Sequence, residues 1–152
     1  MFLGHYEHAL DDKGRLTIPA KFRPGLQKGL VITRGLDNCL LVFPEEAWHV
    51  LAGQVSDASL TNLVNPHWRR ARRHFFATAE YLIPDQNGRI VLPAGLRKAV
   101  GIDGSVVLVG SYNYIELWSP EAWRTESAEV EKSRGNRGFW KAFLNGAGGA
   151  QE

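Results

Sequence analysis

The sequence lacks the features of a secreted or membrane-embedded protein. It has a single cysteine, Cys39, so it cannot form an intrachain disulfide, which suits a reducing compartment. No apolar stretch approaches the roughly 20 residues that a membrane-spanning helix needs. Residues 1–12 contain neither a basic segment nor a long apolar run, so no signal peptide is expected. We therefore expect a soluble cytoplasmic protein.

Catalytic and metal-binding motifs are also missing. The chain has no Walker-type phosphate loop, no dinucleotide-binding fingerprint and no GxSxG sequence. His5 and His8 fall in an expected strand, where a spacing of three places them on opposite faces. His67 and His74 stand two helical turns apart, too far for one zinc ion. We expect no enzymatic activity, no cofactor, no metal and no small-molecule substrate.

The net charge of +2 is too small to identify a partner, but the charge is unevenly distributed. The segment WRRARRH, residues 68–74, holds four arginines among seven residues. On a helix, Arg69, Arg72 and Arg73 would cluster on one side. This cluster fits a solvated helix face and fits equally well a stripe that contacts phosphates or a neighbouring subunit.

One short pattern occurs twice. LDDKGRLTIPAKFR, residues 10–23, and IPDQNGRIVLPAGLR, residues 83–97, contain Asp, Gly, Arg, Pro, Ala and Arg in the same order and spacing. A shift of 74 residues gives six identities in the thirteen positions from 11 to 23, where chance would give roughly one. A shift of 75 then aligns LLVFPEEAW, residues 40–48, with IELWSPEAW, residues 115–123. The chain therefore contains two copies of one structural unit.

Each copy predicts the same succession of elements. A short strand enters a tight turn in which Gly14 or Gly88 takes a positive φ, and a second strand follows. Pro19 or Pro93 then opens a short helix, and Gly101 ends the second of these helices. Two further strands and a closing helix complete each unit.

The expected fold class is α+β, mostly β with short helices. A unit made of short hairpins buries little apolar surface alone, so we expect the two copies to pack on each other as a pseudo-twofold pair. We divide the chain into a first repeat (1–55), a helical linker (56–78), a second repeat (79–124), and a helical end with a loose Gly-rich tail (125–152). In that tail, GFWKAFL, residues 138–144, could form one apolar helical turn.

The repeated turns are the strongest candidates for a binding site. Each places an arginine, Arg15 or Arg89, directly after the turn glycine. A basic turn can enter the major groove of DNA, where arginine pairs with guanine O6 and N7. Alternatively, Asp11 and Asp85 form ion pairs with these arginines and lock the turns. The spacing favours the two interpretations equally, and both can hold for one residue.

The quoted segments resemble the MraZ family. The start MFLGHYEHALDDKGRLTIPAKFR, then GLVITRGLDNCLLVFPEEAW, then the second copy from LIPDQNGRIVLPAGLRKAVGI to IELWSPEAW match it in order, over about residues 1–124. The paired Asp-x-x-x-Arg motifs, each with Gly before the Arg and Pro four residues after it, are specific together. Each copy also resembles the DNA-binding unit of the AbrB and SpoVT type.

This resemblance implies a fold, a function and a set of site residues. The fold would be a swapped-hairpin β-barrel made from two AbrB-like repeats of one chain. The function would be that of a nucleoid-associated bacterial transcriptional regulator. It would form ring-like homo-oligomers and bind double-stranded DNA at direct repeats in the promoter of its own division and cell-wall operon. Arg23 and Arg97 match basic positions that contact DNA in AbrB-like relatives, and Asp11 and Asp85 are the ion-pair partners of the motif. The predicted DNA-binding residues are Lys13, Arg15, Arg23, Arg89, Arg97 and Lys98.

A protein-interaction module of the AbrB-like antitoxin type is the alternative. In such antitoxins a disordered tail wraps around a toxin, and residues 138–144 could serve this purpose. A salt titration separates the two hypotheses, because DNA binding weakens on a log–log line with a slope near −0.9 per phosphate neutralised.

Overall fold

The computed structural model of the chain describes residues 1–148, and the last four residues of the predicted tail lie outside this range. In the first repeat and linker, the elements are β1 (His5–Ala9), β2 (Arg15–Thr17), a 3₁₀ turn (Arg23–Gly25), β3 (Leu30–Arg34), β4 (Leu40–Pro44), α1 (Glu45–Val55), α2 (Leu60–Leu63) and α3 (Pro66–Phe76). The remaining elements are β5 (Glu80–Leu82), β6 (Arg89–Val91), α4 (Ala94–Ala99), β7 (Ser105–Gly110), β8 (Ile115–Trp118), α5 (Pro120–Ser133) and α6 (Arg137–Gly148).

The strands form two antiparallel sheets. Six strands pair in the order β1-β7-β8-β4-β3-β5, and β2 pairs with β6 in a separate two-stranded ribbon. The α+β class is therefore confirmed. The six-stranded sheet has two free ends, β1 and β5, and is not closed into a barrel. The closing helices of the two repeats, α1 and α5, and the linker helix α3 form where they were expected.

Equivalent strands of the two repeats exchange partners. The first strand of repeat one, β1, pairs with β7 of repeat two, and the first strand of repeat two, β5, pairs with β3 of repeat one. In the ribbon β2 of one repeat pairs with β6 of the other. The centre of the large sheet joins β4 to β8, with Leu41 opposite Glu116. Each repeat therefore completes the sheets of the other.

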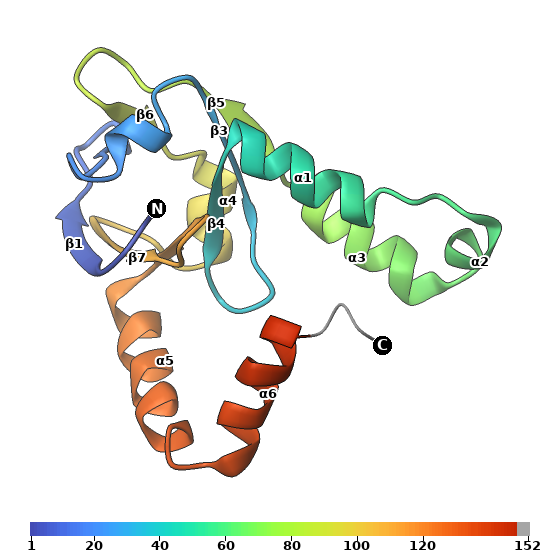
Figure 1. Cartoon of the computed structure of the whole chain (residues 1–152). Helices are drawn as coiled ribbons and strands as arrows, with labels where there is room; N and C mark the ends of the chain where they lie inside the picture. The colour runs from blue at the N-terminus through green and yellow to red at the C-terminus, as the bar shows by residue number, and fades with distance from the viewer. Residues whose placement is uncertain (149–152) are drawn as a thin grey trace. The chain divides into compact units, whose positions relative to one another are not determined.

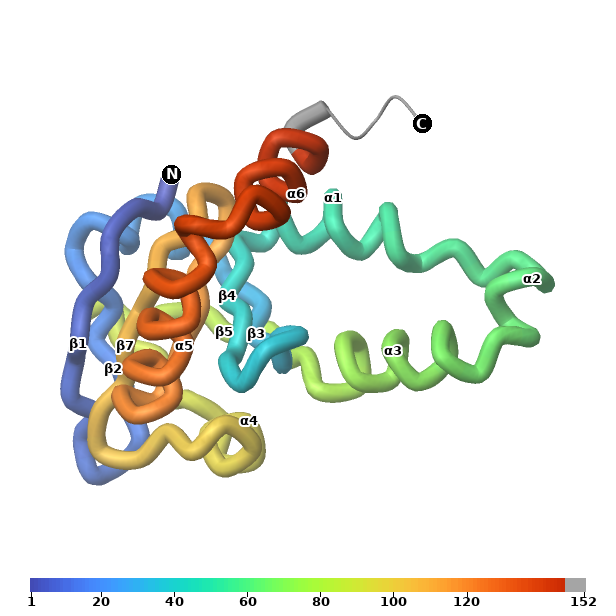
Figure 2. The backbone as a smooth tube through the Cα atoms, turned by 90° about the horizontal axis from the view of Figure 1, so that it is seen from below, coloured from blue at the N-terminus to red at the C-terminus, as the bar shows by residue number. Residues whose placement is uncertain are grey.

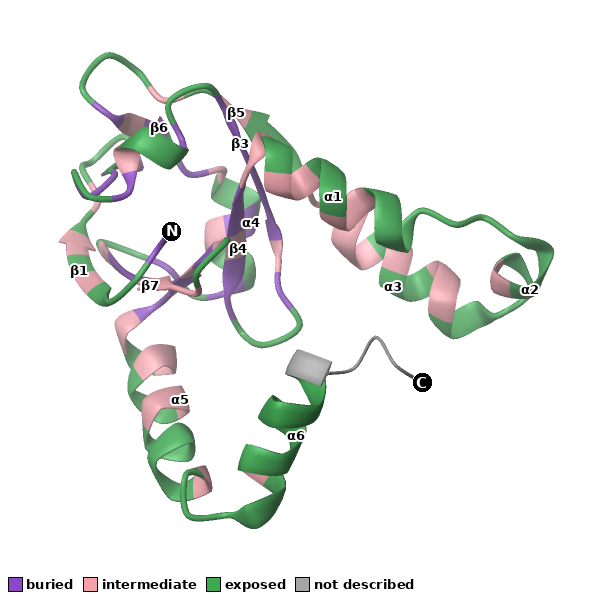
Figure 3. Ribbon diagram, in the orientation of Figure 1, coloured by how far each residue is buried: buried purple, intermediate pink, exposed green. Residues whose placement is uncertain are grey.

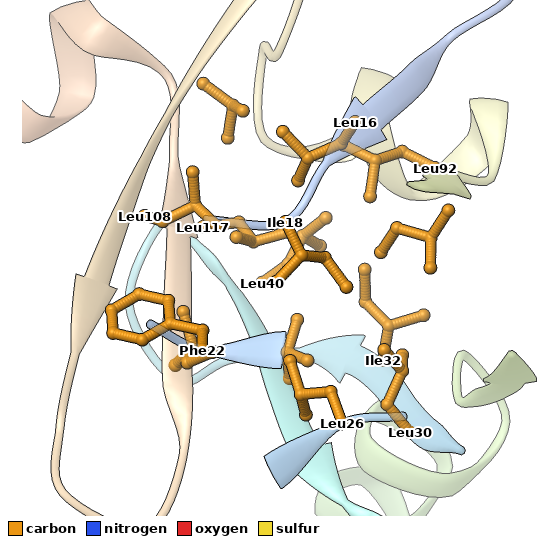
Figure 4. Packing of buried hydrophobic residues seen from close by; sticks show 14 of the residues in the cluster. Leu16, Ile18, Phe22, Leu26, Leu30, Ile32, Leu40, Leu92, Leu108 and Leu117 are labelled. Atoms are coloured by element: carbon orange, nitrogen blue, oxygen red, sulfur yellow. The ribbon is translucent and has the colours of Figure 1, made fainter. Parts of the chain in front are cut away.

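The hydrophobic core lies where the ribbon packs on the large sheet (Figure 4). Leu16 and Ile18 from the first repeat meet Leu92, Leu108 and Leu117 from the second in one cluster. All five side chains are at most 2% exposed. Because both repeats supply this cluster, neither encloses a core of this composition alone.

The helix after the repeated proline forms in only one copy. In the second copy α4 ends as predicted, with Gly101 at φ +71° and N–H bonds from Gly101 and Ile102 back to the carbonyls of Lys98 and Arg97. In the first copy the expected helix is wrong, since residues 19–22 form turns that lead into the 3₁₀ turn. Pro24 explains the difference, because proline has no N–H group to donate to the carbonyl four residues earlier, that of Ala20.

Helices α1, α2 and α3, residues 45–76, form an arm in which α1 leads away from the sheet and α3 returns (Figures 1 and 2). Asn65 caps α3 by accepting from the N–H groups of His67 and Trp68, and Pro66 occupies the first turn. Trp48 of α1 stacks on Phe75 of α3 at a centroid distance of 5.2 Å. Aromatic contacts within the arm and with Phe43 of β4 stabilise it, and no residue of α1 or α3 is fully buried (Figure 3).

Residues 121–148 form a second compact unit that contains most of α5 and all of α6. The expectation of a loose tail is wrong for residues 137–148, which are helical throughout. Asn136 begins this helix by accepting from the Gly138 N–H at 2.7 Å. Among residues 1–148, no helix combines the length and apolar character needed to cross a bilayer.

Candidate nucleic-acid interface

The ribbon of β2 and β6 has one buried and one exposed face. Its register pairs Arg15 with Val91, Leu16 with Ile90, and Thr17 with Arg89. Leu16 and Ile90 are 1% and 4% exposed and point into the core. Because strand side chains alternate between faces, Arg15 and Arg89 both stand on the opposite, outer face. The two repeats therefore present their motif arginines on a common side.

The first turn is held by the Asp11 carboxylate. One oxygen accepts from the backbone N–H groups of Lys13 and Arg15 at 3.0 and 2.8 Å, and the other accepts from Arg15 Nε at 2.5 Å. The Gly14 N–H donates to the Asp11 carbonyl at 3.0 Å, and Gly14 has φ +74° as predicted. A single carboxylate thus fixes both the loop and the arginine that follows it.

The second turn repeats this arrangement. Asp85 accepts from the backbone N–H groups of Asn87 and Arg89 and from Arg89 Nε, each at 2.9 Å. Gly88 has φ +72°, and its N–H donates to the Asp85 carbonyl at 3.0 Å. The repeated sequence therefore encodes the same local geometry twice.

These hydrogen bonds stabilise the ionised form of both carboxylates. The pKa of Asp11 lies below its usual value, chiefly because the Arg15 backbone N–H donates to it, while partial desolvation opposes the lowering. The pKa of Asp85 is lowered in the same way, chiefly by the backbone N–H of Arg89. Both aspartates therefore carry a negative charge at neutral pH.

The ion pair and the exposure of the arginine coexist in both turns. The side chains of Arg15 and Arg89 are 31% and 32% exposed, although each donates through Nε to its aspartate. The two interpretations of the motif are thus compatible in geometry. The aspartate fixes the stem of the guanidinium group while part of the side chain faces solvent.

Arg23 and Arg97 lie at the turns, but each lies at the turn of the other repeat. Arg97 approaches Gly14 so closely that a Cβ atom there would be 3.0 Å from its Nη2 atom. Arg23 approaches Gly88 in the same way. Both arginines are half-buried. The sequence gives no indication of this exchange, because the residues in each contact are 65 and 83 positions apart.

The two lysines of the predicted set differ in their relation to the first turn. Lys13 is part of the first turn, and Lys98 follows Arg97, which contacts that turn. Both lysines are exposed. The second turn carries Asn87 at the position of Lys13. The first turn therefore has one more basic side chain of its own than the second, and the exposed carboxylate of Asp12 offsets its charge.

The arginine cluster of α3 divides into two pairs. Arg69 donates to the Leu63 carbonyl at 2.7 Å, and Arg72 donates to the Val55 carbonyl at 3.3 Å. Arg72 also lies over the rings of Trp68 and Phe76, at 5.2 and 5.0 Å from their centroids. These two arginines stabilise the arm, whereas Arg70 and Arg73 are exposed. Among the described residues, no group of three or more His, Cys, Asp or Glu side chains could hold a metal ion.

Comparisons with known proteins agree with this repeated architecture. A family model described as "MraZ protein, putative antitoxin-like" matches residues 1–70 and 75–137, a range for each repeat. The transcriptional regulator MraZ of Herpetosiphon aurantiacus is 49% identical over 125 residues, which cover 82% of this chain and 85% of that protein. The transcriptional regulator MraZ of Thermomicrobium roseum is 44% identical over 127 residues, which cover 84% and 87%. That of Roseiflexus castenholzii is 44% identical over 124 residues, which cover 82% and 85%.

Proposed function

The chain belongs to the MraZ family, and from this premise we propose that it is a sequence-specific DNA-binding transcriptional regulator that reads DNA with the outer face of its β2–β6 ribbon. The relatives are named as regulators of transcription, so the family is one of regulators and not of enzymes. One observation carries the proposal: Arg15 and Arg89 share the exposed face of the ribbon.

A two-stranded ribbon fits the major groove of B-DNA, and arginine is the side chain that most often reads guanine there. Arg15 and Arg89 are diagonal neighbours in the register, which places their Cβ atoms roughly 7–8 Å apart. This separation is close to two base-pair steps of about 3.4 Å each. Asp11 and Asp85 orient the two guanidinium groups, so less conformational entropy is lost when these groups meet bases.

Phosphate contacts complete the proposed interface. Six basic residues surround the ribbon and its turns, against three carboxylates, those of Asp11, Asp12 and Asp85. Lys13 and Lys98 hold phosphates, and this fixes the orientation of the protein on the duplex. One ribbon covers little DNA. A ring-like homo-oligomer would set several ribbons on promoter repeats about 10 bp apart, and multivalency would raise the affinity. The site would lie in the promoter of the protein's own operon, in the nucleoid.

The test is a binding titration on the DNA upstream of the protein's own gene and on a scrambled duplex. Arg15→Ala and Arg89→Ala should each weaken specific binding by about 1–3 kcal/mol. Arg124→Ala, which removes the same charge from an exposed position of α5, serves as the matched control. Wild-type affinity in a folded Arg15→Ala, Arg89→Ala double variant would contradict the proposal.

A second candidate function is protein binding through α6. Trp140, Phe143 and Leu144 are 52%, 70% and 64% exposed and lie at helical spacing, as in helices that dock into an apolar groove. The antitoxin-like description of the family model is consistent with this second role. Replacing the three residues with alanine would leave DNA binding intact and abolish the binding of a protein partner. Loss of both activities would show that α6 supports the DNA-binding assembly instead.

A further inference from the structure

We propose that Arg23 and Arg97 are positioning residues, each of which holds the DNA-binding turn of the opposite repeat. This inference rests on the proposed function, because it assigns a role within the same interface. It differs from the role that the family resemblance implies, which is direct contact with DNA.

At the second turn Ile18, Arg23 and Gly88 each contact the other two. The Ile18 N–H donates to the Gly88 carbonyl at 2.8 Å, and the Ile18 carbonyl accepts from Arg23 Nε at 2.8 Å. The Arg23 side chain then lies against Gly88, where a Cβ atom would be 2.8 Å from Arg23 Cδ and 3.1 Å from its Cζ. The turn glycine is therefore held on its carbonyl side by the strand end and on its Cα side by the arginine.

At the first turn Leu92, Arg97 and Gly14 contact one another in the same way, with the roles of the two repeats interchanged. The Leu92 N–H donates to the Gly14 carbonyl at 3.0 Å, and the Leu92 carbonyl accepts from Arg97 Nε at 3.1 Å. A Cβ atom on Gly14 would meet Arg97 Cζ at 3.1 Å. Arg23 lies in a 3₁₀ turn and Arg97 in α4, yet both side chains occupy the same position at a turn. The contact is therefore a feature that the two repeats share, although their local structures differ here.

Arginine is the residue that this position requires. Its Nε–H donates to the strand-end carbonyl while its planar head covers the glycine, whereas lysine carries its donors on a single terminal nitrogen and has no flat surface. With Nε committed to a half-buried carbonyl, the arginine is fixed before DNA arrives. Each turn then has the motif Asp and Arg from its own repeat and a covering Arg from the other.

The experiment uses Arg23→Lys and Arg97→Lys, which keep the positive charge and lose the Nε–carbonyl bond. Each variant is made in the wild-type, Arg15→Ala and Arg89→Ala backgrounds of the full chain. Specific and scrambled duplexes are titrated over a range of salt concentrations, and melting temperatures are measured. Arg124→Lys is the matched control.

If each arginine positions the turn of the opposite repeat, its lysine variant should lose specific DNA affinity only where that turn still reads DNA. Arg23→Lys should weaken specific binding roughly tenfold, the size of one lost charge-assisted hydrogen bond. It should do so in the wild-type and Arg15→Ala backgrounds but not with Arg89→Ala, where the second turn no longer reads DNA. Arg97→Lys should show the mirror pattern. Binding to the scrambled duplex and the salt slope should stay unchanged.

Two results would overturn the proposal. Phosphate contacts predict near-normal affinity for the lysine variants, and for Arg23→Ala and Arg97→Ala a salt slope smaller by about one on both duplexes. A purely structural role predicts a lower melting temperature with unchanged affinity of the folded protein.

A measurement without DNA separates this inference from the proposed function. In ¹⁵N NMR spectra Arg23→Lys should shift the amide signal of Gly88 and leave that of Gly14, and Arg97→Lys should do the opposite. If wild-type protein shows no specific DNA binding, the proposed function fails, and these signals still decide whether the arginines hold the turns. Equal shifts at both glycines in each variant would overturn the positioning role.

Discussion

Asp11 and Asp85 make the stability of the two turns dependent on pH. Their pKa values in the folded protein lie below the ordinary 3.8, chiefly because backbone N–H groups donate to the carboxylates. A lowered folded pKa stabilises the protein above the unfolded value, and this contribution is lost as the pH falls through the folded value. An Asp11→Asn, Asp85→Asn double variant should therefore be less stable at pH 7 and should lose less stability below pH 3.8 than the wild type does.

Urea midpoints measured from acid to neutral pH test this expectation. Asp12→Asn is the control, because it removes a neighbouring exposed carboxylate that does not hold a turn. Parallel pH profiles for the double variant and the wild type would show that the two carboxylates do not contribute to stability.

The local chemistry of the site could be predicted from the sequence, whereas its contacts across the repeats could not. The spacing of Asp11, Gly14 and Arg15 predicted both the positive φ and the ion pair, because all three lie in one turn. Arg23 could only be predicted as a basic residue. Its partners are the Ile18 carbonyl and the surface of Gly88, and main-chain acceptors carry no signature in the sequence.

Among the secondary-structure elements, the sequence predicted the strands and the helices α1, α3 and α5, but not the full length of α6. Short apolar runs separated by turn residues identified β3, β4, β7 and β8. The tail was expected to be loose because it is rich in glycine, yet α6 forms. The apolar residues Phe139, Trp140 and Phe143 interact along this helix, and Trp140 Nε1 donates to the Arg134 carbonyl at 2.8 Å.

The end of α3 depends on a strand for its hydrogen bonding. The last carbonyls of a helix lack partners within the helix. Here the buried Thr33 of β3 donates to the Phe75 carbonyl at 2.5 Å, and Thr78 donates to the His74 carbonyl at 2.7 Å. Thr33→Val keeps the shape of the side chain and removes the donor. It should lower the free energy of unfolding by about 1–3 kcal/mol, the cost of an unpaired buried acceptor.

Chemical denaturation of Thr33→Val and of Thr61→Val measures this cost. Thr61 is exposed in α2, so its replacement should change stability little. DNA affinity should not change in either variant, because both residues lie outside the ribbon. Wild-type stability in Thr33→Val would mean that water satisfies the helix end equally well.

Across the whole molecule, the duplication was visible in the sequence, but the pairing of its strands was not. Local patterns predict that β1 and β5 are strands, but they do not predict which strands pair with them. Leu16 and Leu92 share one core because β2 pairs with β6, and β1 and β5 exchange between the repeats in the same arrangement. The resemblance to swapped-hairpin proteins implied such an exchange, whereas composition and periodicity did not.

This exchange predicts that a single repeat cannot fold as a monomer. A cut after residue 78 removes the partners of β1 and β2 and one of the two partners of β4 from the first fragment, and it exposes part of the shared core. Residues 1–78 and 79–152 should each lack a cooperative thermal transition at low micromolar concentration, and an equimolar mixture should regain one. Circular dichroism with light scattering measures both properties.

At higher concentration a fragment can pair with its own copy, because β2 resembles β6, so any folding of one fragment should appear together with a doubled mass. A fragment that melts cooperatively while its measured mass is that of a monomer would contradict the dependence of each repeat on the other.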